Sequence, residues 1–157
     1  MRNIRSIRLA YLLLVACIGV ARAQQYPDPK RFENEIVAYE QQDRRQMPPA
    51  GAIVLTGSSS IARWGAQAPA ALAPLTVIPR GFGGSTMHEL LYYLDRVALV
   101  YQPRAILIYE GDNDTAANPP VPEAAIVADL RTIIARIHEK LPACRIYVLS
   151  IKPSVLR

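Results

Sequence analysis

Residues 52–60 read Ala-Ile-Val-Leu-Thr-Gly-Ser-Ser-Ser. A short unbroken apolar run that stops at a polar turn is typical of a strand buried on both faces of a parallel sheet. Such a strand needs helices on both sides to cover it. These nine residues therefore predict an α/β fold, with a serine-rich turn at the carboxyl end of its first strand.

Three more apolar runs follow, at residues 76–78, 105–109 and 145–151. Segments with apolar residues at helical spacing precede the last two, at residues 85–99 and 122–141. Strands that alternate with helices predict a three-layer αβα sandwich around a central parallel sheet. Any active site is then expected at the carboxyl ends of the strands.

Residues 24–50 precede the first strand and are polar and charged. Phe32, Ile36 and Tyr39 follow one another at helical spacing, which predicts a helix with one apolar face. We therefore divide the chain into an N-terminal helical segment at residues 24–50 and an α/β domain at residues 51–157.

The first 23 residues have the three parts of a secretory signal. Residues 1–8 are basic, residues 9–20 are apolar, and Ala21-Arg22-Ala23 forms the small-residue cleavage site. Cleavage after Ala23 is predicted, giving a secreted or periplasmic protein. The apolar run is short for a bilayer span, so no stable membrane insertion is expected after cleavage.

Two other interpretations of this N-terminus stay open. Residues 14–17 read Leu-Val-Ala-Cys, which resembles a lipoprotein signal with lipid attachment at Cys17. The third is an uncleaved membrane anchor. The other cysteine, Cys144, has no partner in the mature chain and is expected to be a buried thiol.

The net charge of +5 comes mostly from the same N-terminal region. Of 18 basic and 13 acidic residues, four arginines and no acidic residue lie among residues 1–23. Without those four the balance is 14 basic against 13 acidic residues. Nucleic-acid binding therefore has no support from composition.

Small, polar and glycine-rich sequences follow three of the predicted strands, at residues 57–60, 81–85 and 111–114. Each alone is compatible with an ordinary turn, and the glycines of residues 81–85 also fit a nucleotide or flavin loop. In a parallel sheet all three sequences would meet at one edge. Their combination is more specific than any one of them.

In order and placement these three blocks resemble those of the SGNH (GDSL-like) hydrolases. Gly57-Ser58-Ser59 stands where that family has Gly-Asp-Ser, Gly84 where it has the glycine of its second block, and residues 111–114 where it has Gly-x-Asn-Asp. The resemblance implies a flavodoxin-like strand order. It also implies that Ser59 is a nucleophile whose N–H binds the oxyanion, and that Gly84 and Asn113 complete the oxyanion hole.

No cofactor and no metal site is expected. Glu110, Asp112 and Asp114 cluster without a histidine or cysteine, which gives a metal site little support. We expect Asp112 to be a solvated loop charge. Asp114 is expected to orient Asn113 or to cap the following turn.

The sequence departs from the family pattern in three places. Ser58 replaces the usual aspartate of the first block, and Pro79 stands where an asparagine is common. The family's Asp-x-x-His block, which supplies the catalytic acid and base, does not follow Ile151. The fold is therefore expected to be incomplete at its C-terminus and the chain impaired or inactive, because His88 and His138 are expected to be structural.

The resulting prediction is a serine hydrolase that cleaves carboxylic esters through an acyl-enzyme on Ser59. Its substrate would be a small-molecule, carbohydrate or lipid ester, with acetyl as one candidate acyl group. A noncatalytic module or pseudoenzyme that binds an acylated glycan is an alternative on the same fold. A nucleotide or flavin binder using residues 81–85 is a third.

Overall fold

The computed structural model describes residues 26–153, which contain a four-stranded parallel sheet in the order β2-β1-β3-β4. This order corresponds to the first four strands of the flavodoxin-like arrangement, so the predicted fold class is confirmed. The predicted signal region, with Cys17, lies outside the described residues. The strands are β1 Ile53–Gly57, β2 Val77–Gly81, β3 Ala105–Tyr109 and β4 Arg145–Val148.

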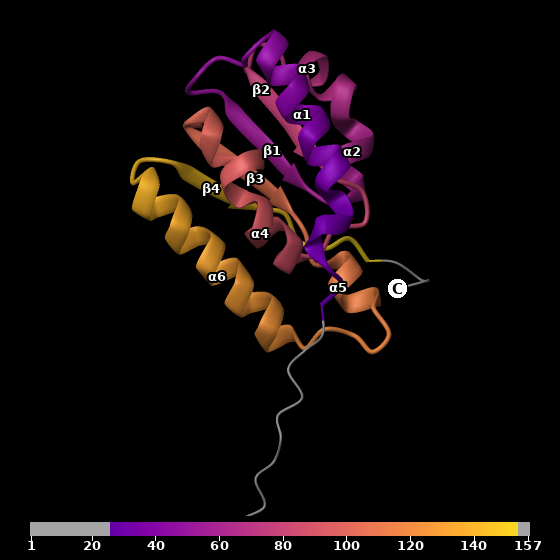
Figure 1. Cartoon of the computed structure of the whole chain (residues 1–157). Coiled ribbons are helices and arrows are strands. Elements are labelled where there is room, and N and C mark those ends of the chain that lie inside the picture. Colours follow the sequence, from indigo (N-terminus) through magenta and orange to yellow (C-terminus); the bar gives the residue numbers. More distant parts are fainter. Residues whose placement is uncertain (1–25, 154–157) are drawn as a thin grey trace, which may run out of the picture.

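Helices cover both faces of the sheet (Figure 1). The longest of them, α6, runs along one side of the molecule (Figure 1). The α-helices are α1 Glu33–Arg45, α2 Ser59–Trp64, α3 Ala68–Ala71, α4 Met87–Val97, α5 Asp112–Ala116 and α6 Glu123–Lys140, and the 3-10 helices are η1 Pro29–Phe32, η2 Gly65–Gln67 and η3 Leu99–Tyr101.

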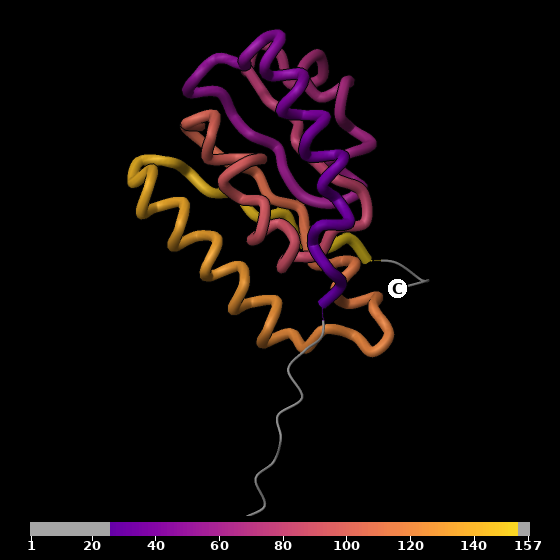
Figure 2. The backbone as a smooth tube through the Cα atoms, viewed as in Figure 1, coloured from indigo at the N-terminus to yellow at the C-terminus, as the bar shows by residue number. Residues whose placement is uncertain are grey.

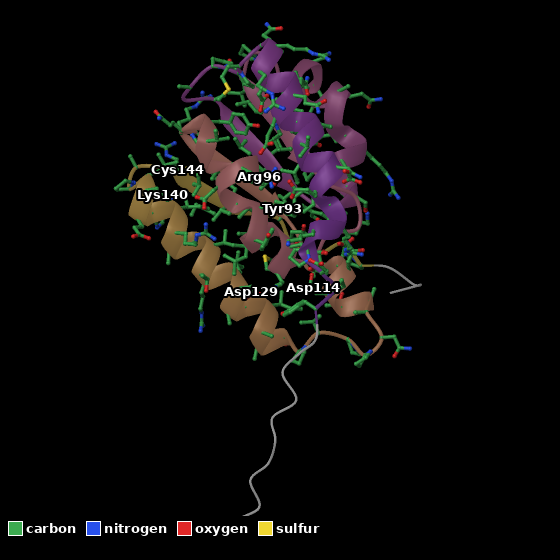
Figure 3. The ribbon with its side chains drawn as sticks, viewed as in Figure 1. Tyr93, Arg96, Asp114, Asp129, Lys140 and Cys144 are labelled. Carbon is green, nitrogen blue, oxygen red and sulfur yellow. The ribbon has the colours of Figure 1, made fainter. Side chains whose placement is uncertain are left out.

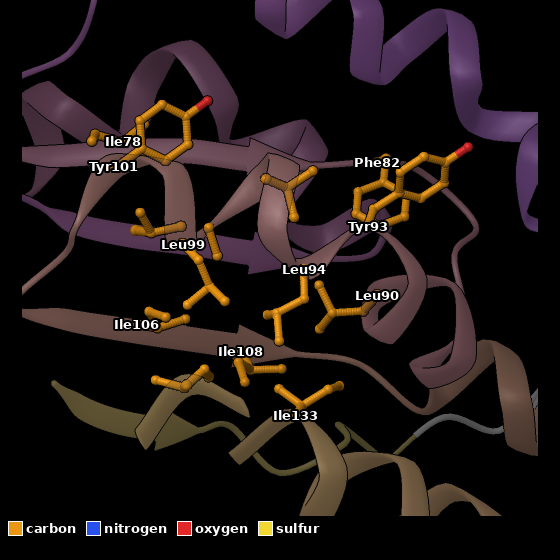
Figure 4. Close-up of a cluster of buried hydrophobic side chains, with 14 of the residues drawn as sticks. Ile78, Phe82, Leu90, Tyr93, Leu94, Leu99, Tyr101, Ile106, Ile108 and Ile133 are labelled. Atoms are coloured by element: carbon orange, nitrogen blue, oxygen red, sulfur yellow. The ribbon is translucent and has the colours of Figure 1, made fainter. Parts of the chain in front are cut away.

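The larger core lies between the sheet and helices α1, α4 and α6. Ile106 and Ile108 of β3 meet Leu90 and Leu94 of α4 and Ile133 of α6, and all five side chains are fully buried (Figure 4). Burial of this kind contributes about 1.5–3 kcal/mol for each large aliphatic side chain. The larger of the two hydrophobic clusters therefore packs on this face of the sheet.

The predicted N-terminal helix packs into that same core. Phe32 and Ile36 are buried in it, and the Tyr39 hydroxyl donates a hydrogen bond of 2.5 Å to the Gly81 carbonyl. The apolar face predicted from their spacing is therefore present. Its contact with Gly81 ties α1 to the end of β2.

Helices α2 and α3 pack on the opposite face, against Leu55, Val77 and Tyr109. A Cβ on Gly81 would lie only 2.5 Å from the Ala62 backbone nitrogen. Glycine is required there because α2 lies directly on β2. The start of α2, where the serines are, is held firmly against the sheet.

The strand ends meet at one edge. Gly57 at the end of β1 lies opposite Gly81 on one side and Tyr109 on the other. Gly57 has φ +128°, and a Cβ there would overlap the Tyr109 carbonyl oxygen. The smooth trace of Figure 2 shows the yellow segment after β4 returning to the same edge, where Ile151 lies beside Gly111.

Strand β4 is shorter and more exposed than expected. The prediction placed a strand at residues 145–151, but β4 ends at Val148, although the Leu149 N–H still bonds to the Ile108 carbonyl at 2.9 Å. Tyr147 and Leu149 are 50% and 44% exposed. Neither side chain belongs to the hydrophobic clusters of the described residues, which include residues 106–109 of β3.

No helix within residues 26–153 combines the length and the apolar character that a membrane crossing needs.

Candidate active site

Ser59 is the first residue of α2, directly after the turn at the end of β1. It is half-buried and lines an open pocket of about 490 Å³. The first N–H groups of a helix have no partner within the helix, so the Ser59 N–H is placed to interact with a bound group. The pocket is lined by Ser59, Ala62, Arg63, Gly83, Gly84 and Asn113.

Gly84 lies in the loop between β2 and α4, with φ +91°. A Cβ at this position would meet no atom within 4 Å, so the need for glycine arises from the backbone conformation. Its N–H points to the Ser58 hydroxyl at 3.2 Å, and its carbonyl accepts a hydrogen bond from the Arg31 guanidinium at 3.0 Å. The peptide groups before and after Gly84 are therefore each held by a hydrogen bond.

Asn113 is the second residue of α5, after β3. Its side-chain amide donates to the Ser58 hydroxyl at 2.5 Å and to the Ser85 carbonyl at 2.7 Å. The three residues expected to act together, Ser59, Gly84 and Asn113, thus line one pocket although they come from three separate loops.

The loop that carries Gly84 is anchored by the start of α4. Thr86 and Glu89 form a capping box, in which each side chain bonds to the other's backbone N–H. Glu89 is fully buried and also forms an ion pair with Arg31. Sequence analysis did not identify Arg31, because its partners lie more than fifty positions further along the chain.

The three carboxylates after β3 are buried, and the expectation of a solvated Asp112 was wrong, since Asp112 is only 4% exposed. Asp114 accepts a hydrogen bond from the Met87 N–H at 3.0 Å. It therefore caps the start of α4 instead of the turn that follows it. Burial raises the pKa of Asp114, and backbone hydrogen bonds from Met87 and from its own N–H oppose that rise.

Glu110 is the most strongly perturbed acid of this group. Burial raises its pKa well above the ordinary value, the hydrogen bond donated by Ser85 opposes the rise, and the nearby charges of Asp114 and Asp112 add to it. Its second carboxylate oxygen has no hydrogen-bond partner. Glu110 lies beneath the loops and does not line the pocket of Ser59.

Neither histidine of the chain lines this pocket. The His88 Nδ1 atom lies 3.3 Å from an Asp129 carboxylate oxygen, and its ring stacks on Tyr26 with centroids 4.2 Å apart. Figure 3 shows Asp129 on α6 near Asp114, at the end of the molecule where α5 lies. His138 lies near the end of α6 and lines a different pocket, with the buried Cys144.

Two cations lie beside the serine turn and were not identified from the sequence. Arg63 lines the pocket from the last turn of α2 and is exposed. The Lys152 ammonium group donates to the Ser60 hydroxyl at 3.2 Å. Within residues 26–153 no group of three or more histidine, cysteine or acidic side chains is arranged to hold a metal ion.

Solved structures with related folds share this architecture. A protein from Streptococcus pneumonia named for platelet activating factor is 24% identical, with a TM-score of 0.67 over 79% of this chain and 56% of that one. A protein from Bacteroides fragilis described as an acylhydrolase is 20% identical, with a TM-score of 0.61 over 70% of this chain and 54% of that one. A GDSL-like lipase from Bacteroides thetaiotaomicron is 20% identical, with a TM-score of 0.61 over 81% of this chain and 60% of that one.

These likenesses establish the fold, and this chain spans little more than half the length of each of the three proteins. No functionally curated protein matches the sequence. The sequence profile of the GDSL-like Lipase/Acylhydrolase family matches residues 46–156, which include all three strand-end blocks. Because that match covers most of the chain, the protein belongs to the GDSL-like lipase/acylhydrolase family.

Proposed function

We propose that this chain carries the nucleophile and the oxyanion-binding groups of a serine ester hydrolase, with Ser59 as the nucleophile. The observation that carries the proposal is the meeting of Ser59, Gly84 and Asn113 at one open pocket, from the ends of three adjacent parallel strands. Membership of a family of lipases and acylhydrolases makes ester hydrolysis the activity at family level, with a small-molecule ester as substrate.

In the proposed reaction the Ser59 oxygen forms a bond to the carbonyl carbon of the ester. The hydroxyl proton passes to a base, and the carbonyl oxygen becomes an oxyanion. The N–H groups of Ser59 and Gly84 and the side-chain amide of Asn113 would stabilise it. Collapse breaks the bond to the alcohol, which leaves with a proton, and water then releases the acid from Ser59.

Burial favours Ser59 over the adjacent serine. Ser58 is completely buried, so an ester carbonyl has no route to its hydroxyl in this conformation. Ser59 lines the open pocket, and its neighbour in that pocket, Gly83, has no side chain to block an approaching ester. The nucleophile assigned by family resemblance is therefore also the accessible one.

The described residues offer no histidine as general base at Ser59, because His88 and His138 lie elsewhere. A serine hydroxyl without a base is a weak nucleophile, although oxyanion-binding groups alone retain some rate. We expect the 157-residue chain to turn over a chromogenic acetate ester slowly. Turnover at a rate typical of esterases that Ser59→Ala removes would contradict this.

Covalent labelling tests the proposal directly. The purified chain is incubated with a small alkyl fluorophosphonate, and the modified peptide is identified by mass spectrometry. We expect one adduct, on Ser59, formed slowly and absent from Ser59→Ala. Labelling of a different serine, or none after prolonged exposure of a folded protein, would reject Ser59 as the nucleophile.

A second candidate function is noncatalytic binding of an acylated glycan, for which the open pocket beside Ser59 would be the binding site. An acetylated xylo-oligosaccharide and its deacetylated counterpart would be titrated into the chain. Binding that requires the acetyl group, without any labelling of Ser59, would support the binding module over the enzyme.

We further propose that the protein acts outside the cytoplasm. The proposal rests on the basic, apolar and small-residue order of residues 1–23. N-terminal sequencing of the exported protein should give Gln24 as the first residue. A chain that starts at a lipid-modified Cys17 would instead identify a lipoprotein.

A further inference from the structure

Ser58 occupies the N-cap position of α2 but does not use its hydroxyl as an N-cap. Its carbonyl accepts the N–H groups of Ile61 and Ala62 at 3.0 Å, which begins the helix. An N-cap serine normally also accepts a helix N–H through its side chain. Here the side chain makes no such bond, so the hydroxyl of this fully buried residue is free for another use.

That hydroxyl is the point where two donors converge. It accepts the Gly84 N–H at 3.2 Å and an Asn113 amide hydrogen at 2.5 Å. A hydroxyl oxygen has two acceptor lone pairs, and these two bonds use both. The loops after β1, β2 and β3 are therefore joined at a single oxygen atom.

The convergence has a consequence for the proposed oxyanion hole. The other amide hydrogen of Asn113 is donated to the Ser85 carbonyl at 2.7 Å. The two donors needed from Gly84 and Asn113 are thus directed at the Ser58 oxygen when no ester is bound. A neutral hydroxyl is a weaker acceptor than an oxyanion, because charge-assisted hydrogen bonds are roughly twice as strong as neutral ones.

We infer that Ser58 is a positioning residue whose hydroxyl holds the Gly84 and Asn113 donors together in the empty site and releases them to the oxyanion. Ser58 itself does not touch the reacting atoms. The inference rests on the proposed function, since only an acyl-transfer site needs these donors for an oxyanion. It assigns a role to one of the three departures from the family pattern, the serine that replaces the usual aspartate.

Three consecutive serines provide matched variants, Ser58→Ala, Ser59→Ala and Ser60→Ala, each of which removes one hydroxyl. The first readout is NMR of the purified ¹⁵N-labelled chain, which follows the Gly84 backbone N–H and the Asn113 side-chain NH₂ without requiring activity. Ser58→Ala should shift both sets of signals, and Ser60→Ala should leave them unchanged. Unchanged Gly84 and Asn113 signals in folded Ser58→Ala would overturn the inference.

The second readout compares the free and the phosphonylated proteins. In the adduct on Ser59 the phosphonyl oxygen should replace the Ser58 hydroxyl as acceptor, so wild type and Ser58→Ala should give the same Gly84 and Asn113 signals. A difference that persists in the adduct would indicate a merely structural hydroxyl and would also overturn the inference. Labelling itself should be about 10-fold slower in Ser58→Ala, as expected for disordered oxyanion donors.

Two further outcomes remain decisive. If Ser58→Ala does not fold, the chemical shifts of the Gly84 N–H and the Asn113 NH₂ protons in wild type are followed on warming. Protons that are hydrogen-bonded within the protein should shift little, as the inference requires. Large shifts, typical of protons bonded to solvent, would overturn it. If wild type is not labelled at all, the proposed nucleophile fails. The free-state NMR comparison still decides whether Ser58 positions the two donors.

Discussion

Strands β3 and β4 run side by side in register, with Ile108 opposite Val148 on the same face. Ile108 is completely buried, whereas Val148 is 45% exposed. Both belong to apolar runs of similar composition in the sequence. The difference arises because Ile108 packs against side chains of α4 and α6, whereas Val148 belongs to neither hydrophobic cluster of the described residues. An edge position alone is not the cause, since β2 is also an edge strand and is buried. An apolar run predicts a strand, but its neighbours determine whether that strand becomes core.

The same contrast separates the site from the β4 edge. At the ends of β1, β2 and β3 polar groups bond to one another across the three strand ends, as the buried Ser58 and the half-buried Gly84 and Asn113 show. Along β4, Tyr147 and Leu149 present apolar surface to solvent. Strands β1, β2 and β3 therefore carry the site, and the function proposed above depends on them.

The largest expected effect is complete loss of covalent labelling in Ser59→Ala, because the attacking oxygen is gone. Val148→Ala is the matched change at the edge and should leave the fluorophosphonate labelling rate within about twofold. The comparison between site and edge would fail if both variants lost labelling to the same extent, since that would indicate a common loss of fold.

A smaller effect is expected from Asn113→Ala, which removes one oxyanion donor. Removal of one such donor typically slows the reaction by about 10²- to 10³-fold. The measurement is the labelling rate of Ser59, with Asn118→Ala on the exposed loop after α5 as control. An Asn113→Ala rate equal to that of the control would remove Asn113 from the proposed oxyanion hole.

The stability difference between the two strands can be measured on one register pair. Ile108→Ala should lower the free energy of unfolding by about 2–5 kcal/mol, because it leaves a cavity in a packed core. Val148→Ala should lower it by roughly 0.5 kcal/mol or less, because this side chain is half exposed. Urea unfolding followed by circular dichroism measures both, and equal losses would show that β4 is core after all.

The smallest effect concerns pH and Glu110. Burial raises its pKa in the folded protein above the ordinary value of 4.5. The stability that this group contributes is therefore fully present below about pH 4.5 and is lost as the pH rises through the folded-state pKa. Glu110→Gln keeps an acceptor for Ser85 but cannot ionise, so its stability relative to wild type should increase with pH.

Thermal unfolding midpoints between about pH 4 and pH 8 test this prediction. The difference between Glu110→Gln and wild type should widen toward the higher pH. A constant difference over that range would mean that the two forms of Glu110 are equally tolerated in the folded protein. The difference between the unfolding midpoints of Val148→Ala and wild type should not change with pH, because both proteins keep Glu110.

The sequence predicted most of the fold because its signals are local. The limits of β3 at residues 105–109 and the helices within residues 85–99 and 122–141 all follow from neighbouring residues. It also located Ser59, Gly84 and Asn113 at three strand ends. The parallel arrangement then brought them to one pocket, as expected from the topology of such sheets.

The errors occurred where an environment had to be inferred. Asp112 was expected to be solvated because it follows a strand in a polar sequence, but the packing of the surrounding loops buries it. Arg31 supports the Gly84 loop from a helix that the sequence places far away. The β4 strand ends earlier than its apolar run, because pairing with β3 sets its length.

By itself the sequence determined the four strands, the helices α1, α4 and α6, and the three family blocks, including the turn that carries Ser59. These features depend on residues within a few positions of one another. Only the tertiary structure decided that the Ser58 hydroxyl receives donors from Gly84 and Asn113 and that Glu110 is held in a raised-pKa environment. These features need groups from three strand ends at hydrogen-bond distance, and no local pattern specifies such a distance.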